Sequence, residues 1–167
     1  AAVAEERPDL HFVYPVHPNP NIAGPVHDLL GGRPNVHLLP PLGYDDFVYL
    51  MMHALFIVTD SGGLQEEAPS LSKPVLVLRD VTERPEAITA GTAKLIGTER
   101  DEVLRWIRTL VDDQQTYLSM AGSRNPYGDG NASMRTVEAI RYFFGLRGTR
   151  PKPFSVAPTN QASRISE

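Results

Sequence analysis

The residues with the clearest chemistry lie between positions 54 and 67. This stretch, ALFIVTDSGGLQEE, runs from an apolar, β-type segment into Asp-Ser-Gly-Gly and then into a helical segment. Gly62 and Gly63 allow the backbone to approach a ligand closely, and the free N–H groups at a helix start attract phosphate. Ser61 can cap that helix and can also donate a hydrogen bond to a phosphate oxygen. The pattern indicates either a phosphate site or a capped tight turn.

Charged residues that could complete such a site follow closely. Glu66 and Glu67 are predicted in the first helical turn, where the helix dipole favours carboxylates. Glu67 could accept two hydrogen bonds from the vicinal hydroxyls of a ribose, although both acids could equally be solvated capping charges. Arg84, in the segment 82–86 after the next apolar run, can present a bidentate fork to phosphate. The simpler alternatives are a capped turn there and a local ion pair at 79–80.

The remaining polar motifs are less specific. His17 stands alone in the loop HPNP, and the other four histidines show no spacing typical of metal ligands. The turn-rich segment NPYGDG positions Tyr127 and Asp129, and it could line a site or only join two helices. The chain has no cysteine, no GxxxxGK[ST] loop, no GxGxxG and no GxSxG elbow. These absences argue against the common ATPase, dehydrogenase and hydrolase templates.

Five apolar, β-type segments alternate with helical segments, and this alternation sets the expected fold. The pattern predicts an α/β domain with a Rossmann-like, doubly wound parallel sheet, in which the loops after the strands meet at one edge. The predicted strands are 10–16, 36–39, 54–59, 74–78 and 93–96, and the predicted helices are 21–30, 44–53, 64–71, a segment after Thr82, 99–113 and 133–144.

Length and charge predict one domain, residues 1–146, followed by a flexible basic tail, residues 147–167. The chain has 167 residues and a net charge of −4, which gives no reason to expect nucleic acid or an anionic membrane as a partner. The longest apolar stretch, 47–58, is too short to cross a bilayer, and no signal peptide opens the chain. We expect a soluble, cytoplasmic protein. Because residues 1–6 read as the last turn of a helix already under way, we also expect a piece of a longer protein.

Three motifs together resemble one known family. HPNP (17–20), the segment 59–92 and NPYGDG (125–130) are similar to the carboxyl-terminal half of the bacterial non-hydrolysing UDP-N-acetylglucosamine 2-epimerases, over roughly 10–144. The resemblance implies a two-domain glycosyltransferase-B architecture, in which two Rossmann-like domains hold a nucleotide sugar between them. The chain resembles the second of these domains without its first strand.

The resemblance also implies roles for individual residues. Glu67 would bind the ribose, Arg84 would lie near the nucleotide, and Phe47 would pack near the uracil. His17 falls in a loop that lies close to a second UDP-N-acetylglucosamine in members regulated by their own substrate. The diphosphate would be held by Ser61, Gly62 and Gly63. Two departures from the family pattern are Leu42, where some members have Gln, and Val81, which replaces Thr.

The implied activity is the interconversion of UDP-N-acetylglucosamine and UDP-N-acetylmannosamine for cell-surface polysaccharides. UDP would leave across C1–C2 and then add back, in a longer protein that we expect to be a homodimer. The acids assigned to proton transfer belong to the absent amino-terminal domain, so we assign no catalytic residue here. No step of the implied reaction calls for a metal or a redox cofactor, so we expect neither. Two alternatives remain: the donor half of a UDP-sugar glycosyltransferase or hydrolysing epimerase, and a non-catalytic nucleotide-sugar-binding module.

Overall fold

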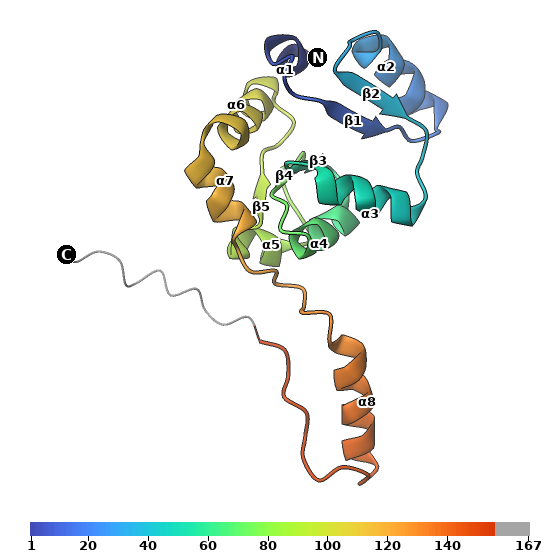
Figure 1. The fold of residues 1–167 in the computed structure, drawn as a ribbon, viewed down its shortest axis with the longest axis vertical. Coiled ribbons are helices and arrows are strands. Elements are labelled where there is room, and N and C mark those ends of the chain that lie inside the picture. The colour runs from blue at the N-terminus through green and yellow to red at the C-terminus, as the bar shows by residue number, and fades with distance from the viewer. Residues whose placement is uncertain (156–167) are drawn as a thin grey trace, which may run out of the picture.

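Helices and strands alternate along most of the chain in the computed structural model, which describes residues 1–155 (Figure 1). The strands are β1 (Phe12–Pro15), β2 (Val36–Leu39), β3 (Ile57–Thr59), β4 (Val75–Val77) and β5 (Ala93–Leu95). The helices are α1 (Ala2–Glu6), α2 (Pro20–Leu30), α3 (Tyr44–His53), α4 (Gly62–Ser70), α5 (Pro85–Ala90), α6 (Arg100–Asp112), α7 (Gln114–Ala121) and α8 (Ala132–Phe143).

Every strand pairing is parallel, which confirms the predicted α/β class. The strands nevertheless form two sheets, one of order β1-β2 and one of order β3-β4-β5. Ile57 pairs with Val75 and Phe12 pairs with Val36, so neighbouring strands run in register. Within residues 1–155, no ladder joins β1 to β3, and each of these strands has one unpaired edge.

The central strand β4 forms the middle of the core. All three of its residues are fully buried, as expected for a strand covered by helices on both faces. Leu76 packs on one face with Ile107 and Leu110 of α6. Val75 and Val77 pack on the other face with alanines of α4 and α5. This core fixes the turns that follow β3 and β4.

Three elements differ from the prediction. The strand predicted over 54–59 is regular only in β3, and Leu55 and Val58 are 46% and 39% exposed, because β3 lies at a sheet edge. Helix α4 begins at Gly62, two residues before the predicted start. Helix α7 was not predicted at all. It begins immediately after α6, where the Asp113 side chain accepts hydrogen bonds from two backbone N–H groups.

Helix α8 projects away from the rest of the domain (Figure 1). Residues 146–155 after it form no helix or strand, and Arg147 pairs with Glu138 of α8 at 2.5 Å. The predicted basic tail also includes Arg164 and Glu167, which lie outside the described residues. Among the helices that the structure describes, none is long and apolar enough to cross a membrane.

Candidate functional site

The turn after β3 presents backbone N–H groups at the start of α4. Ser61 occupies the N-cap position, and Gly62 and Gly63 are the first helical residues. The Ser61 N–H donates to the Thr59 hydroxyl at 3.0 Å, which fixes the turn to the end of the strand. The prediction that the Ser61 side chain caps the helix is wrong, because its hydroxyl makes no capping hydrogen bond. The first N–H groups of α4 therefore receive no acceptor from Ser61.

A carboxylate from the turn after β4 lies against this helix start. A Cβ atom added to Gly62 would meet the Glu83 Oε1 atom at 2.4 Å, so glycine leaves the space that the carboxylate fills. Glu83 also accepts a hydrogen bond from Arg79 at 2.8 Å. Its own backbone N–H, followed by the charges of Arg79 and Arg84, holds the pKa of the Glu83 carboxyl below its usual range. The helix start is thus already next to an internal anion.

Arg84 lies at the start of α5 and is held by the neighbouring acid of α4. Its Nε donates to Glu66, and one terminal nitrogen donates to the Glu83 carbonyl at 3.2 Å. The alternative of a local ion pair at 79–80 does not hold, because Arg79 bonds Glu83 instead. Glu66 is also not in the first turn of α4, because that helix begins earlier than predicted.

The structure brings together only part of the predicted site. Ser61, Gly62 and Arg84 lie in one cluster with Glu66 and Glu83. The cluster stands at the carboxyl ends of two adjacent parallel strands, where ligands bind in open α/β sheets.

The other predicted residues lie on different elements. Glu67 follows Glu66 on α4 and is half-buried. Phe47 is half-buried on α3, and His17 is exposed in the loop after β1. The His17 Nδ1 accepts the Asn19 N–H at 3.2 Å, which places the proton of the neutral ring on Nε2. His17 also lines a cavity of about 330 Å³ together with His27 and the prolines at 18, 40 and 41.

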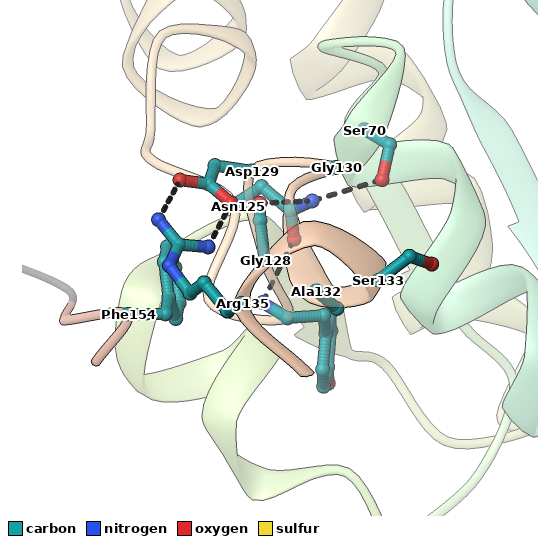
Figure 2. Close-up of a pocket in the computed structure, with 10 residues that line it drawn as sticks. Ser70, Asn125, Gly128, Asp129, Gly130, Ala132, Ser133, Arg135 and Phe154 are labelled. Carbon is teal, nitrogen blue, oxygen red and sulfur yellow. Dashed lines mark hydrogen bonds and ion pairs between the residues drawn. The ribbon is translucent and has the colours of Figure 1, made fainter. Parts of the chain in front are cut away.

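The NPYGDG segment lines a larger cavity, of about 500 Å³, between α4 and α8 (Figure 2). Asn125 donates to the Ser70 hydroxyl at 2.8 Å, and Asp129 pairs with Arg135 at 2.6 Å. Because Ser70 ends α4 and Ser61 precedes it, this cavity lies about 12 Å along the helix from the glycine turn. Asn125 and Asp129 both bond residues outside the segment, which joins α7 to α8 and lines this cavity.

Two residues of the cluster, Gln65 and Glu83, were not predicted from the sequence as site residues. Gln65 is completely buried and bonds both the Ser61 carbonyl and the Thr82 hydroxyl. Glu83 was seen only as part of the segment 82–86. For Gln65 the only available signal was its position one helical turn after Ser61. Among residues 1–155 there is no group of three or more side chains suited to a metal ion.

Comparison with known proteins defines the class to which this architecture belongs. The structure superimposes on a structure of S. aureus MnaA with UDP, with a TM-score of 0.87 and 45% identity over 92% of this chain and 42% of that one. It also matches the Neisseria meningitidis UDP-GlcNAc 2-epimerase bound to UDP-GlcNAc, with a TM-score of 0.79 and 50% identity over 84% of this chain and 38% of that one. The fold is therefore a domain of the glycosyltransferase-B type.

The family follows from the sequence match. The model of the UDP-N-acetylglucosamine 2-epimerase family matches residues 1–141, so the chain belongs to this family. The Escherichia coli K12 UDP-N-acetylglucosamine 2-epimerase is 52% identical over 141 residues, which are 84% of this chain and 38% of the relative. The chain thus spans less than half the length of this relative.

Proposed function

We propose that this chain is the UDP-binding half of a non-hydrolysing UDP-N-acetylglucosamine 2-epimerase. One observation carries the proposal: the glycine turn after β3 and the arginine turn after β4 form one polar cluster in a member of this family. A relative that is 50% identical is described as bound to UDP-GlcNAc, which supports the substrate class. In this proposal Ser61, Gly62 and Gly63 bind the diphosphate.

The proposed chemistry begins with loss of the C2 proton and cleavage of the C1–O bond. UDP leaves and 2-acetamidoglucal forms; UDP then returns to C1 while C2 is protonated from the other face. The cluster would stabilise the departing diphosphate through α4 N–H groups and Arg84. A guanidinium has five N–H donors, so Arg84 can keep its hydrogen bond to Glu66 and still donate to a phosphate oxygen.

The remaining proposed contacts are to the nucleoside and to a second substrate. Glu67 would bind the ribose and Phe47 would pack near the uracil. His17 would contact a regulatory UDP-N-acetylglucosamine through the N–H at Nε2, since its Nδ1 is occupied by Asn19. The cavity beside His17 is about 330 Å³, which supports a ligand contact at this loop.

Proton transfer at C2 is assigned to an amino-terminal domain of the longer protein, which we propose forms a homodimer. Two surfaces that no other part of residues 1–155 covers support such a domain. One is the unpaired edges of β1 and β3, where Val13, Tyr14 and Val58 are 39–40% exposed, and where we propose that the missing first strand pairs. The other is the apolar face of α8, formed by Met134, Val137, Ile140 and Phe144, which are 52–68% exposed.

The test is product analysis in D₂O. The longer protein should convert UDP-N-acetylglucosamine to UDP-N-acetylmannosamine and incorporate deuterium at C2, whereas this chain alone should turn over nothing. Free N-acetylmannosamine would indicate a hydrolysing enzyme, and sugar transfer would indicate a glycosyltransferase. Absence of any turnover by the longer protein would favour a non-catalytic binding module. Measurable epimerisation by this chain alone would refute the division of labour proposed here.

A further inference from the structure

Gln65 is a buried polar side chain at the centre of the candidate site. It lies on α4, is 0% exposed, and is among the largest fully buried side chains of the described residues. Burying an amide costs free energy unless both of its ends find hydrogen-bond partners. Both ends are satisfied here: Nε2 donates to the Ser61 carbonyl at 3.2 Å, and Oε1 accepts the Thr82 hydroxyl at 2.6 Å.

Thr82 extends this connection to the arginine. While its hydroxyl donates to Gln65, the same oxygen accepts the Arg84 N–H at 3.0 Å. A continuous line of hydrogen bonds therefore runs from the Ser61 carbonyl to the Arg84 backbone. It joins the turn after β3 to the turn after β4, two segments that are separated in sequence but lie at the same edge of the sheet.

We propose that Gln65 is a positioning residue, which holds the glycine turn and the arginine turn in the one arrangement that fits a diphosphate. The inference rests on the proposed function. Only an amide satisfies both partners, because Ser61 offers an acceptor and Thr82 offers a donor; a carboxylate lacks the donor and a thioether lacks both strong groups. The phosphate part of nucleotide affinity therefore depends on Gln65, whereas the nucleoside part does not.

The test compares UDP with uridine as ligands of the whole chain, in titrations followed by NMR. Gln65→Met keeps the volume but removes both hydrogen bonds, and Thr82→Val removes the hydroxyl. Each should weaken UDP binding about tenfold while uridine binding stays within about twofold. Thr82→Ser should retain UDP binding, and the double variant should be no weaker than Gln65→Met, because both changes break the same line.

A matched control separates positioning from general stability. Thr92 is another buried hydroxyl, 2% exposed, which bonds the Ala87 carbonyl at 3.2 Å before β5, at the opposite end of the strands. Thr92→Val should lower the thermal unfolding midpoint without changing the ratio of the UDP and uridine affinities. If Gln65→Met does not fold, the Thr82→Val and Thr82→Ser pair gives the same test.

The outcomes are distinct. Two results would refute the inference in a chain that binds UDP. In the first, the Gln65 and Thr82 variants bind UDP as tightly as the unsubstituted chain. In the second, they lose affinity for UDP and for uridine to the same extent. If the unsubstituted chain shows no saturable UDP binding, the proposed site on this domain fails and the inference fails with it. A selective loss of UDP affinity in Gln65→Met and Thr82→Val, with retention in Thr82→Ser, supports the positioning role.

Discussion

Glu83 places its carboxylate beside Gly62, next to the start of α4. Its Oε1 atom fills the space beside Gly62, and Arg79 holds its other oxygen at 2.8 Å. A carboxylate and a phosphate cannot share this position without repulsion, which amounts to about 1 kcal/mol for one pair of charges in water. A diphosphate bound at the first N–H groups of α4 would therefore lie close to the charge of Glu83.

The first prediction concerns this charge. Glu83→Gln should bind UDP about fivefold more tightly, because the repulsion is removed while the shape is kept. Glu86→Gln makes the same charge change at an exposed acid in the first turn of α5 and should have a smaller effect. Calorimetric titration at low salt measures both. Equal or weaker binding by Glu83→Gln would contradict the repulsion between the Glu83 carboxylate and the bound phosphate.

The second prediction concerns the ribose. Glu67→Ala should weaken both UDP and uridine about tenfold or more, because the sugar hydroxyls that the two ligands share lose a charged acceptor. Asp28→Ala, at an exposed acid of α2, is the control and should change neither affinity. A loss limited to UDP would assign Glu67 to the phosphates instead.

At the residue scale, chemical type and strand position were enough to predict that Ser61, Gly62 and Arg84 lie close together. The alternation of apolar runs located the carboxyl ends of the strands, where these residues stand. The sequence did not reveal which acid pairs with which arginine. Arg79 bonds Glu83 rather than its chain neighbour, because side-chain pairing depends on the path of the turn. Gln65 was missed because burial of a polar residue leaves no periodic signal.

A charged contact holds the start of helix α8 to the loop that precedes it. Asp129 pairs with Arg135 at 2.6 Å (Figure 2). It also accepts the Asn131 N–H at 3.1 Å. The Arg135 guanidinium, and secondly the Asn131 backbone, hold the pKa of the Asp129 carboxyl well below its usual range. Stability from such a group is present above the unfolded pKa of about 3.9 and is lost as the pH falls through the folded value.

The third prediction follows from the lowered pKa of the Asp129 carboxyl. Asp129→Asn should lower the thermal unfolding midpoint at pH 6, and the difference from the unsubstituted chain should shrink as the pH falls below about 4. Circular dichroism measured between pH 6 and pH 2 follows the change. A difference that persists unchanged at pH 2 would exclude an electrostatic origin.

At the element scale, the sequence predicted the strands and most helices, because apolar periodicity reports burial directly. Helix α7 was missed because its eight residues have no buried side chain and only a capping Asp113 at their start. The division into two sheets was also missed. Local patterning predicts that a segment is a strand, but pairing depends on which strands lie beside one another.

At the scale of the whole molecule, many large apolar side chains of residues 1–155 are exposed to solvent instead of packing in the core. Met134, Val137 and Ile140 form a stripe on α8, and Phe143 is 82% exposed. Large exposed apolar patches on a soluble domain indicate an interaction surface. On the proposed account this surface contacts the rest of the longer protein.

The fourth prediction tests that surface. Val137→Lys with Ile140→Lys should reduce the binding of an apolar fluorescent dye to this chain by about half, while leaving UDP binding unchanged. The same pair in the longer protein should lower epimerase activity. Arg141→Gln, at an exposed polar position on the same helix, is the control. Full activity of the longer protein with both lysines would show that α8 does not pack in the assembled enzyme.

The central claim is that UDP binds at the turns after β3 and β4. A calorimetric titration of this chain with UDP, repeated on Glu67→Ala, tests it most directly. The account predicts saturable binding that the substitution abolishes or weakens at least tenfold. No binding at millimolar UDP, or binding that is indifferent to Glu67, would contradict it.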